Sequence, residues 1–180
     1  MATKDDEVHV KLGWHEILTA GYVGVMRNII AIKRNLQPGN NAGINNAWTL
    51  AIEGAMGELA VASHLSCFWA WTIGQLDRRD VGGFQVKTNM SRRLDDLIIQ
   101  PNNPVGEIYI GVLSFCPDFY ITGWIDWTEA TRKKYSLDMR VPGRPAYFIP
   151  RADLEPMSTL PPAKLGIAQP DNFIDEFLGG

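Results

Sequence analysis

The spacing of the apolar residues changes once along this 180-residue chain, and the change limits the folds open to it. Before about residue 65 these residues recur every three or four positions, as on one face of an α-helix. Beyond Trp71 they come in short runs bounded by Gly, Pro and Asn, as in β-strands. Helices followed by strands predict an α/β protein.

Two helices are expected in the first part. The N-terminal helix spans 13–36 and stops at the segment Gln37-Pro38-Gly39. The second begins near Asn45 or Asn46, either of which can cap it, and runs to about residue 65. Small residues recur along this second helix and permit it to approach a sheet closely: Ala51, Gly54, Ala55, Gly57, Ala60 and Ala62.

The second part predicts strands at 84–88, 97–100, 108–115, 119–125 and 146–149, with a short helix at 127–134. The segment 150–180 is rich in proline and is expected to run extended over the surface. Neither a repeat nor a low-complexity linker divides the chain, so residues 1–180 are expected to form one domain.

Composition excludes several classes of protein. No run approaches the roughly 18 apolar residues that span a bilayer, so no membrane partner is expected. The two cysteines, Cys67 and Cys116, have no Cys-x-x-Cys spacing, which argues against a disulfide scaffold or a zinc site. The acidic first residues do not resemble a signal peptide, and we expect a cytoplasmic protein. Six tryptophans lie beside apolar residues, as core tryptophans do.

Basic residues are concentrated although the net charge is only −3. The first cluster comprises Arg78, Arg79, Lys87, Arg92 and Arg93; the second comprises Arg132, Lys133, Lys134, Arg140, Arg144 and Arg151. Such segregation permits one face to meet phosphates while the whole chain stays acidic. A mixed, solvated surface is the other interpretation, and both stay open.

The most polar group in an apolar setting is Asp80, Gln85 and Lys87, with Glu58 on the second helix. In a strand, Gln85 and Lys87 share one face. Asp80 lies an odd number of positions before Gln85, and the Gly82-Gly83 pair can form the turn that swings it round. We expect the helix of Glu58 to pack against the face of Gln85 and Lys87.

These residue types suit phosphate chemistry. Magnesium prefers oxygen ligands, which the side chains of Glu58, Asp80 and Gln85 can supply. Lys87 adds a positive charge, or a proton-handling amine, where negative charge builds up.

The same residues resemble the motif of a known protein family. The segment Gly54 to Glu58, followed by Asp80-x4-Gln85-x-Lys87, resembles the PD-(D/E)XK nuclease superfamily, and Gln-x-Lys resembles its Mrr-like branch. Gly123-Trp124-Ile125 and the Pro-Ala-Tyr-Phe-Ile-Pro segment are similar to small phage-encoded members. The motif covers roughly residues 54 to 90. Two departures are the absence of a proline before Asp80 and the short Asp-to-Gln spacing.

The resemblance implies a restriction-endonuclease-like fold, a mixed central sheet flanked by helices. It implies a Mg²⁺- or Mn²⁺-dependent nuclease that hydrolyses DNA phosphodiester bonds, with Glu58, Asp80, Gln85 and Lys87 as catalytic residues and the first three as metal ligands. The residues expected to hold flanking phosphates are Arg78, Arg79, Thr88, Asn89, Arg92 and Arg93. A homodimer, or a complex with a phage or host protein, stays open.

Each assignment has a structural alternative. Glu58 can solvate a helix surface, Asp80 can cap the Gly-Gly turn, and Lys87 can be an edge-strand charge. Because Gln85 lacks the usual carboxylate charge, the chain can also be an inactive nuclease-fold protein that binds nucleic acid or another protein.

Overall fold

Two antiparallel helices form one layer of the molecule. The computed structural model describes residues 7–35, 44–73, 79–90, 96–132, 135 and 145–162, and all structural statements below concern these residues. The helices are α1 (Trp14–Lys33) and α2 (Ile44–His64). They approach so closely at Gly24 that a Cβ there would lie 2.5 Å from the Cα of Ile52, which explains a glycine in the middle of a helix.

A mixed four-stranded sheet lies beneath the helices, in the order β1-β5-β4-β2. Its strands are β1 (Val8–Lys11), β2 (Gln85–Asn89), β4 (Ile108–Phe115) and β5 (Asp118–Asp126). β1 and β4 run antiparallel to β5, whereas β2 runs parallel to β4. β2 is therefore an edge strand.

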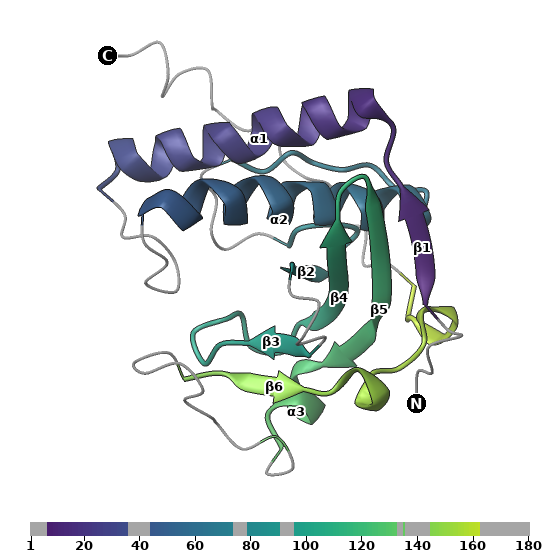
Figure 1. Cartoon of the computed structure of the whole chain (residues 1–180). Helices are drawn as coiled ribbons and strands as arrows, with labels where there is room; N and C mark the ends of the chain where they lie inside the picture. Colours follow the sequence, from purple (N-terminus) through teal and green to yellow (C-terminus); the bar gives the residue numbers. More distant parts are fainter. Residues whose placement is uncertain are drawn as a thin grey trace.

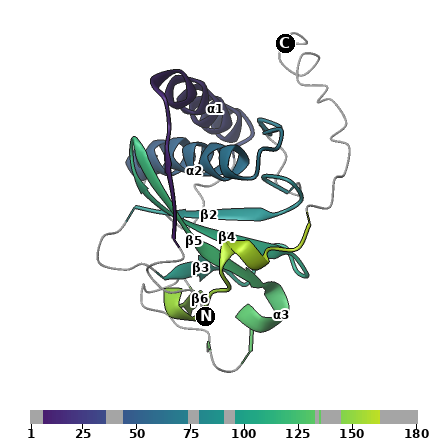
Figure 2. The ribbon, with the colours of Figure 1, turned by 90° about the vertical axis from the view of Figure 1, so that its right-hand side faces the viewer.

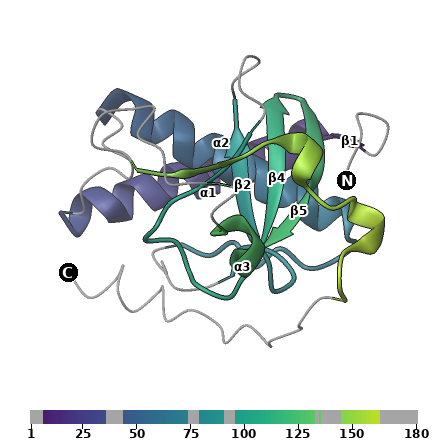
Figure 3. The ribbon, with the colours of Figure 1, turned by 90° about the horizontal axis from the view of Figure 1, so that it is seen from below.

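The other face of this sheet is covered by smaller elements. β3 (Leu97–Ile99) and β6 (Tyr147–Ile149) form a two-stranded antiparallel sheet, and α3 (Trp127–Ala130) follows β5 directly. Figure 2 shows the two helices on one side of the larger sheet and β3 and β6 on the other. In Figure 3, seen from below, β6 and α3 lie in front of the sheet and the helices behind it.

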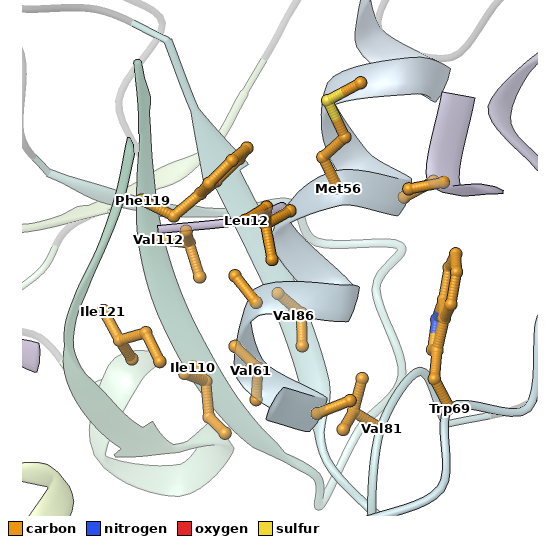
Figure 4. Packing of buried hydrophobic residues seen from close by; sticks show 14 of the residues in the cluster. Leu12, Met56, Val61, Trp69, Val81, Val86, Ile110, Val112, Phe119 and Ile121 are labelled. Atoms are coloured by element: carbon orange, nitrogen blue, oxygen red, sulfur yellow. The ribbon is translucent and has the colours of Figure 1, made fainter. Parts of the chain in front are cut away.

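Two apolar clusters correspond to these two sides. The larger joins α2 to the sheet and includes Met56, Val61, Val86, Ile110 and Ile121, and Figure 4 shows them together. The smaller cluster lies on the opposite face and joins β4 and β5 to β3, β6 and α3. The sheet is thus buried on both faces.

Most of the expected elements are confirmed. The α/β class holds, both long helices lie within a few residues of the expected bounds, and the five expected strands appear as β2 to β6. α3 ends at Ala130, earlier than expected. The sequence missed β1, whose short alternation directly follows the charged first residues of the chain.

The beginning of the C-terminal segment is more ordered than an extended strap. It contains two 3-10 turns, η4 (Arg151–Asp153) and η5 (Met157–Thr159). Glu155 exchanges two backbone hydrogen bonds with Trp124 of β5, at 2.8 and 2.9 Å. The rest of the expected strap, 163–180, lies outside the described residues. Among the described helices, none is long and apolar enough to cross a membrane.

Candidate active site

A tight turn carries Asp80 back to the edge of β2. Gly82 and Gly83 both have positive φ (57° and 93°), and the amide of Phe84 donates to the carbonyl of Val81 at 2.8 Å. Asp80 Oδ2 then accepts a hydrogen bond from the Val86 amide at 2.8 Å. The expectation that the glycines form this turn is confirmed. As an edge strand, β2 has an outward amide at Val86 that Asp80 satisfies.

The two faces of β2 have different neighbours. Val86 belongs to the cluster under α2, and Thr88 lies so close to Gly57 that a Cβ there would be 2.0 Å from its Oγ1. Lys87 lies on the opposite face, with its Nζ 5.7 Å from the ring centroid of Tyr109. Gln85 shares that face by alternation and is buried. The expectation that α2 packs against the face of Gln85 and Lys87 is therefore wrong.

The size and polarity of the side chains explain which face of β2 lies under α2. The small residues of α2 need apolar or short side chains beneath them, and Val86 and Thr88 meet that need, whereas Gln85 and Lys87 do not.

Glu58 is buried in an ion pair that the sequence did not reveal. Arg27 Nη1 and Nη2 donate to its two carboxylate oxygens at 2.6 and 2.8 Å, and Trp69 Nε1 donates to Oε2 at 3.0 Å. Arg27 also donates to the Thr72 carbonyl at 2.8 Å. The interpretation that Glu58 solvates a helix surface is excluded, since its side chain is only 7% exposed.

A signal for Arg27 existed in the sequence. Ala20, Val23 and Gly24 form the buried face of α1, and Arg27 continues the same three- and four-residue spacing. A charge in that position requires a buried partner. Only the packing of α1 on α2 identifies the partner as Glu58.

The charges of Asp80, Glu58 and Lys87 act on one another. Burial, together with the charge of Glu58, raises the pKa of Asp80 to about 7, although the Val86 amide, Lys87 and Arg27 oppose the rise. Burial lowers the pKa of Lys87, while Asp80 and Glu58 oppose that change. Asp80 also contributes to a raised pKa of Tyr109, after burial and Glu107. Residues of α2, the Gly-Gly turn and β2 thus share one buried electrostatic site.

Glu58, one of the three expected metal ligands, already has other partners. Both oxygens of Glu58 accept hydrogen bonds from Arg27 and Trp69, and the described residues contain no group of three His, Cys, Asp or Glu side chains that could hold a metal ion. Asp80 and Gln85 are the other two expected ligands. Magnesium commonly takes one or two protein ligands and completes its shell with water and substrate phosphate. The chemistry of this reduced donor pair fits Mg²⁺.

The residues expected to hold DNA phosphates differ in their surroundings. Arg79 Nε pairs with Glu107 Oε2 at 2.7 Å. The Thr88 hydroxyl is buried beneath Gly57 without a hydrogen-bond partner among the described residues, and its expected phosphate contact stays a prediction. Asn89 Nδ2 donates to the Asp96 carbonyl at 3.4 Å. Arg78, Arg92 and Arg93 lie outside the described residues.

A groove of about 620 Å³ opens beside this site, between the N-terminal half of α2, β2 and β3. Its polar lining includes Lys87, Asn89, Asp96, Gln100 and Asn103. Lys87 belongs both to the groove and to the buried charges. The groove therefore offers a route by which a ligand can reach Lys87.

Comparison with models of known protein families, with curated protein sequences and with solved structures finds no match for this chain.

Proposed function

We propose that this chain is a Mg²⁺- or Mn²⁺-dependent nuclease that hydrolyses DNA phosphodiester bonds at the edge of β2. The observation that carries the proposal is the effect of burial and of neighbouring charges on the pKa values of Asp80 and Lys87. Groups with strongly perturbed pKa values beside a groove are typical of catalytic sites. The restriction-endonuclease-like fold belongs to the proposal, supported by the order of the helix glutamate, Asp80 and Gln85-x-Lys87.

Each residue has a separate task in this proposal. In its ionised form, Asp80 would hold the cation together with the side-chain carbonyl of Gln85. Lys87, reached from the groove, donates a hydrogen bond from its ammonium to an oxygen of the scissile phosphate. Glu58 does not touch the cation; with Arg27 it forms a fixed charge pair beside Asp80. When bound, the cation lowers the pKa of a water and offsets charge on the phosphate.

One observation favours a second candidate, a nuclease-fold protein that binds nucleic acid without cleaving it. Arg27 and Lys87 both act against the rise in the pKa of Asp80, and Arg27 already pairs with Glu58. The negative charges of Glu58 and Asp80 and the positive charges of Arg27 and Lys87 then offset one another without a metal. The same site is then a structural ion network, and the groove is a binding surface.

Cleavage assays separate the two candidates. The full chain is incubated with plasmid, linear and single-stranded DNA in Mg²⁺, Mn²⁺ or EDTA, alongside Lys87→Ala and the control Lys11→Ala on β1. We expect cleavage only with metal, reduced about 10²–10³-fold in Lys87→Ala, because a donor to the developing charge is lost. Lys11→Ala should match the parent.

Equal cleavage by the parent and Lys87→Ala, or cleavage that persists in EDTA, contradicts the proposal. Absence of cleavage together with a shift of DNA on native gels favours the second candidate. Circular dichroism of each variant shows whether a loss of activity reflects unfolding.

A further inference from the structure

The outward face of α1 carries a continuous apolar stripe. It consists of Leu18, Tyr22, Val25, Ile29 and Ile32, preceded by Trp14, and we refer to these six residues as the α1 stripe. Its exposed fractions reach 67% at Trp14 and 62% at Leu18 and Tyr22. The expectation that Trp14 packs in the core is wrong.

Exposure on this scale is unusual for side chains of this kind. Five of the ten large, exposed apolar residues among the described part of the chain lie on this one helix face. Apolar side chains that stand singly on a surface need no explanation, but a contiguous patch marks an interaction site.

α2 cannot cover the α1 stripe. α1 uses its opposite face for α2, where Ala20, Val23 and Gly24 are buried. Figures 1 and 2 show α1 as the outermost element on the helical side of the molecule. α1 is therefore apolar on two faces, and one of them has no cover among the described residues.

The spacing indicates that the partner is a helix. From Leu18 the stripe advances by four, three, four and three residues to Ile32. This alternation is the heptad seam of a coiled coil, whose side chains fit between those of a facing helix. His15 is exposed, its ring lies tilted against that of Trp14 with the centroids 4.4 Å apart, and it extends the seam by one more position.

We infer that α1 pairs antiparallel with α1 of a second copy of this chain. The stripe is bulky in its N-terminal half, with Trp14, Leu18 and Tyr22, and thinner and β-branched in its C-terminal half. An antiparallel pair places Tyr22 against Val25 of the second copy and Leu18 against its Ile29, so every layer has a similar width. A parallel pair would oppose bulky side chains at one end and small ones at the other.

Charge favours the same orientation. The first turn of α1 is acidic, through Glu16, and the last turn is basic, through Lys33. Antiparallel helices bring opposite ends together and align their dipoles favourably. In a parallel pair, the like charges of the two Lys33 side chains would lie at the same end.

The exposed surface is large enough for such a dimer. Two aromatic and four aliphatic side chains of this exposure present roughly 600 Å² per copy. Two copies then bury about 1,200 Å², the lower end of the range of specific interfaces. The contact is isologous, as a two-fold dimer requires.

Sedimentation velocity over a concentration series tests the inference on the full chain. We expect a dimer for the parent and a monomer for Leu18→Glu and Ile29→Glu, which place charge on the seam. The matched control is Val105→Glu, because Val105 is 73% exposed and lies outside α1; it should sediment like the parent. A monomeric parent at about 100 μM, or dimers in all variants, overturns the inference.

Cross-linking tests the orientation. In a background with Cys67→Ser and Cys116→Ser, Leu18→Cys protein is mixed with Ile29→Cys protein and oxidised. The antiparallel pair predicts a disulfide-linked heterodimer from the mixture and little cross-linking of either variant alone. Cross-linking of each variant alone, without enrichment of the heterodimer, overturns the antiparallel arrangement.

The dimer is independent of the proposed nuclease activity. Lys87→Ala should dimerise like the parent, since Lys87 lies on the face of the sheet that turns away from the helices. Sedimentation and DNA cleavage therefore report on separate claims.

Discussion

At the scale of single residues, the neighbours of a side chain determine its protonation, and Asp80 is the clearest case. Its carboxylate accepts a hydrogen bond from the Val86 amide, yet burial and Glu58 raise its pKa to about 7. The folded state therefore holds the Asp80 proton more tightly than the unfolded chain, where the pKa is near its model-compound value of 3.8. Ionising Asp80 works against folding.

Because the folded protein holds the Asp80 proton more tightly, the stability of Asp80→Asn relative to the parent should depend on pH. The contribution of Asp80 to stability is present below about pH 4 and lost as the pH rises toward 7, whereas asparagine does not titrate. Relative to the parent, Asp80→Asn should gain stability over that range, by at least about 3 °C in Tm at pH 8, which is about 1 kcal/mol for this length. Thermal melts of both proteins from pH 4 to 8 measure the gap; a gap that shrinks as the pH rises contradicts the prediction.

Gln85 allows a direct test of the metal site. Gln85→Glu adds a carboxylate in nearly the same volume and should tighten Mg²⁺ or Mn²⁺ binding at least about tenfold, because a unit charge near a cation contributes several kcal/mol even at a dielectric near 20. Gln85→Leu removes the oxygen and should weaken binding. Titration calorimetry compares the three proteins, and three indistinguishable isotherms would remove Gln85 from the site.

At the scale of elements, close packing of α2 on β2 decides which face of the strand turns to the charges. Gly57 lies over Thr88, and Gly24 lies over the backbone of Ile52. Small residues on both helices thus allow two close contacts: Gly57 of α2 approaches the sheet, and Gly24 of α1 approaches α2. These contacts fix α2 and with it the position of Glu58.

Gly57→Ala tests the contact with β2. Its new Cβ would lie 2.0 Å from Thr88 Oγ1, and the overlap should cost about 2 kcal/mol of unfolding free energy. Thr88→Ala removes that hydroxyl, so the double variant should recover much of the loss. Urea denaturation of the four proteins gives the coupling energy, and additive effects would mean that the two residues do not meet.

At the scale of the whole molecule, Arg27 links parts that lie far apart in sequence. It extends from α1, pairs with Glu58 of α2, and donates to Thr72 in the connection toward the Gly-Gly turn. The helical layer and the candidate site therefore share one buried ion pair. The α1 stripe, on the opposite side of the same helix, stays outside this network.

Removing Arg27 should destabilise the whole fold. Arg27→Met leaves the charge of Glu58 buried without its partner, which typically costs about 3–5 kcal/mol. The double variant Arg27→Met with Glu58→Met removes both charges and should be more stable than the single variant. Chemical denaturation decides between these outcomes; a double variant weaker than either single one would show that the pair stabilises beyond charge compensation.

The sequence by itself determined both long helices, five of the six described strands and their order. Three- and four-residue spacing identified both long helices, alternation and turn residues identified β2 to β6, and Gly82-Gly83 indicated the turn that returns Asp80 to β2. These features depend on neighbours within a few positions, so the local chain carries the information.

The tertiary structure alone decided which side chains meet. Spacing places Gln85 and Lys87 on one face of a strand, but only the packing of Gly57 on Thr88 determines that α2 covers the other face. Spacing likewise shows that α1 is apolar. It does not show that Arg27 pairs with Glu58, one of the expected metal ligands, or that Trp14 lies outside the core. Burial and pairing depend on residues distant in sequence, and no local pattern specifies them.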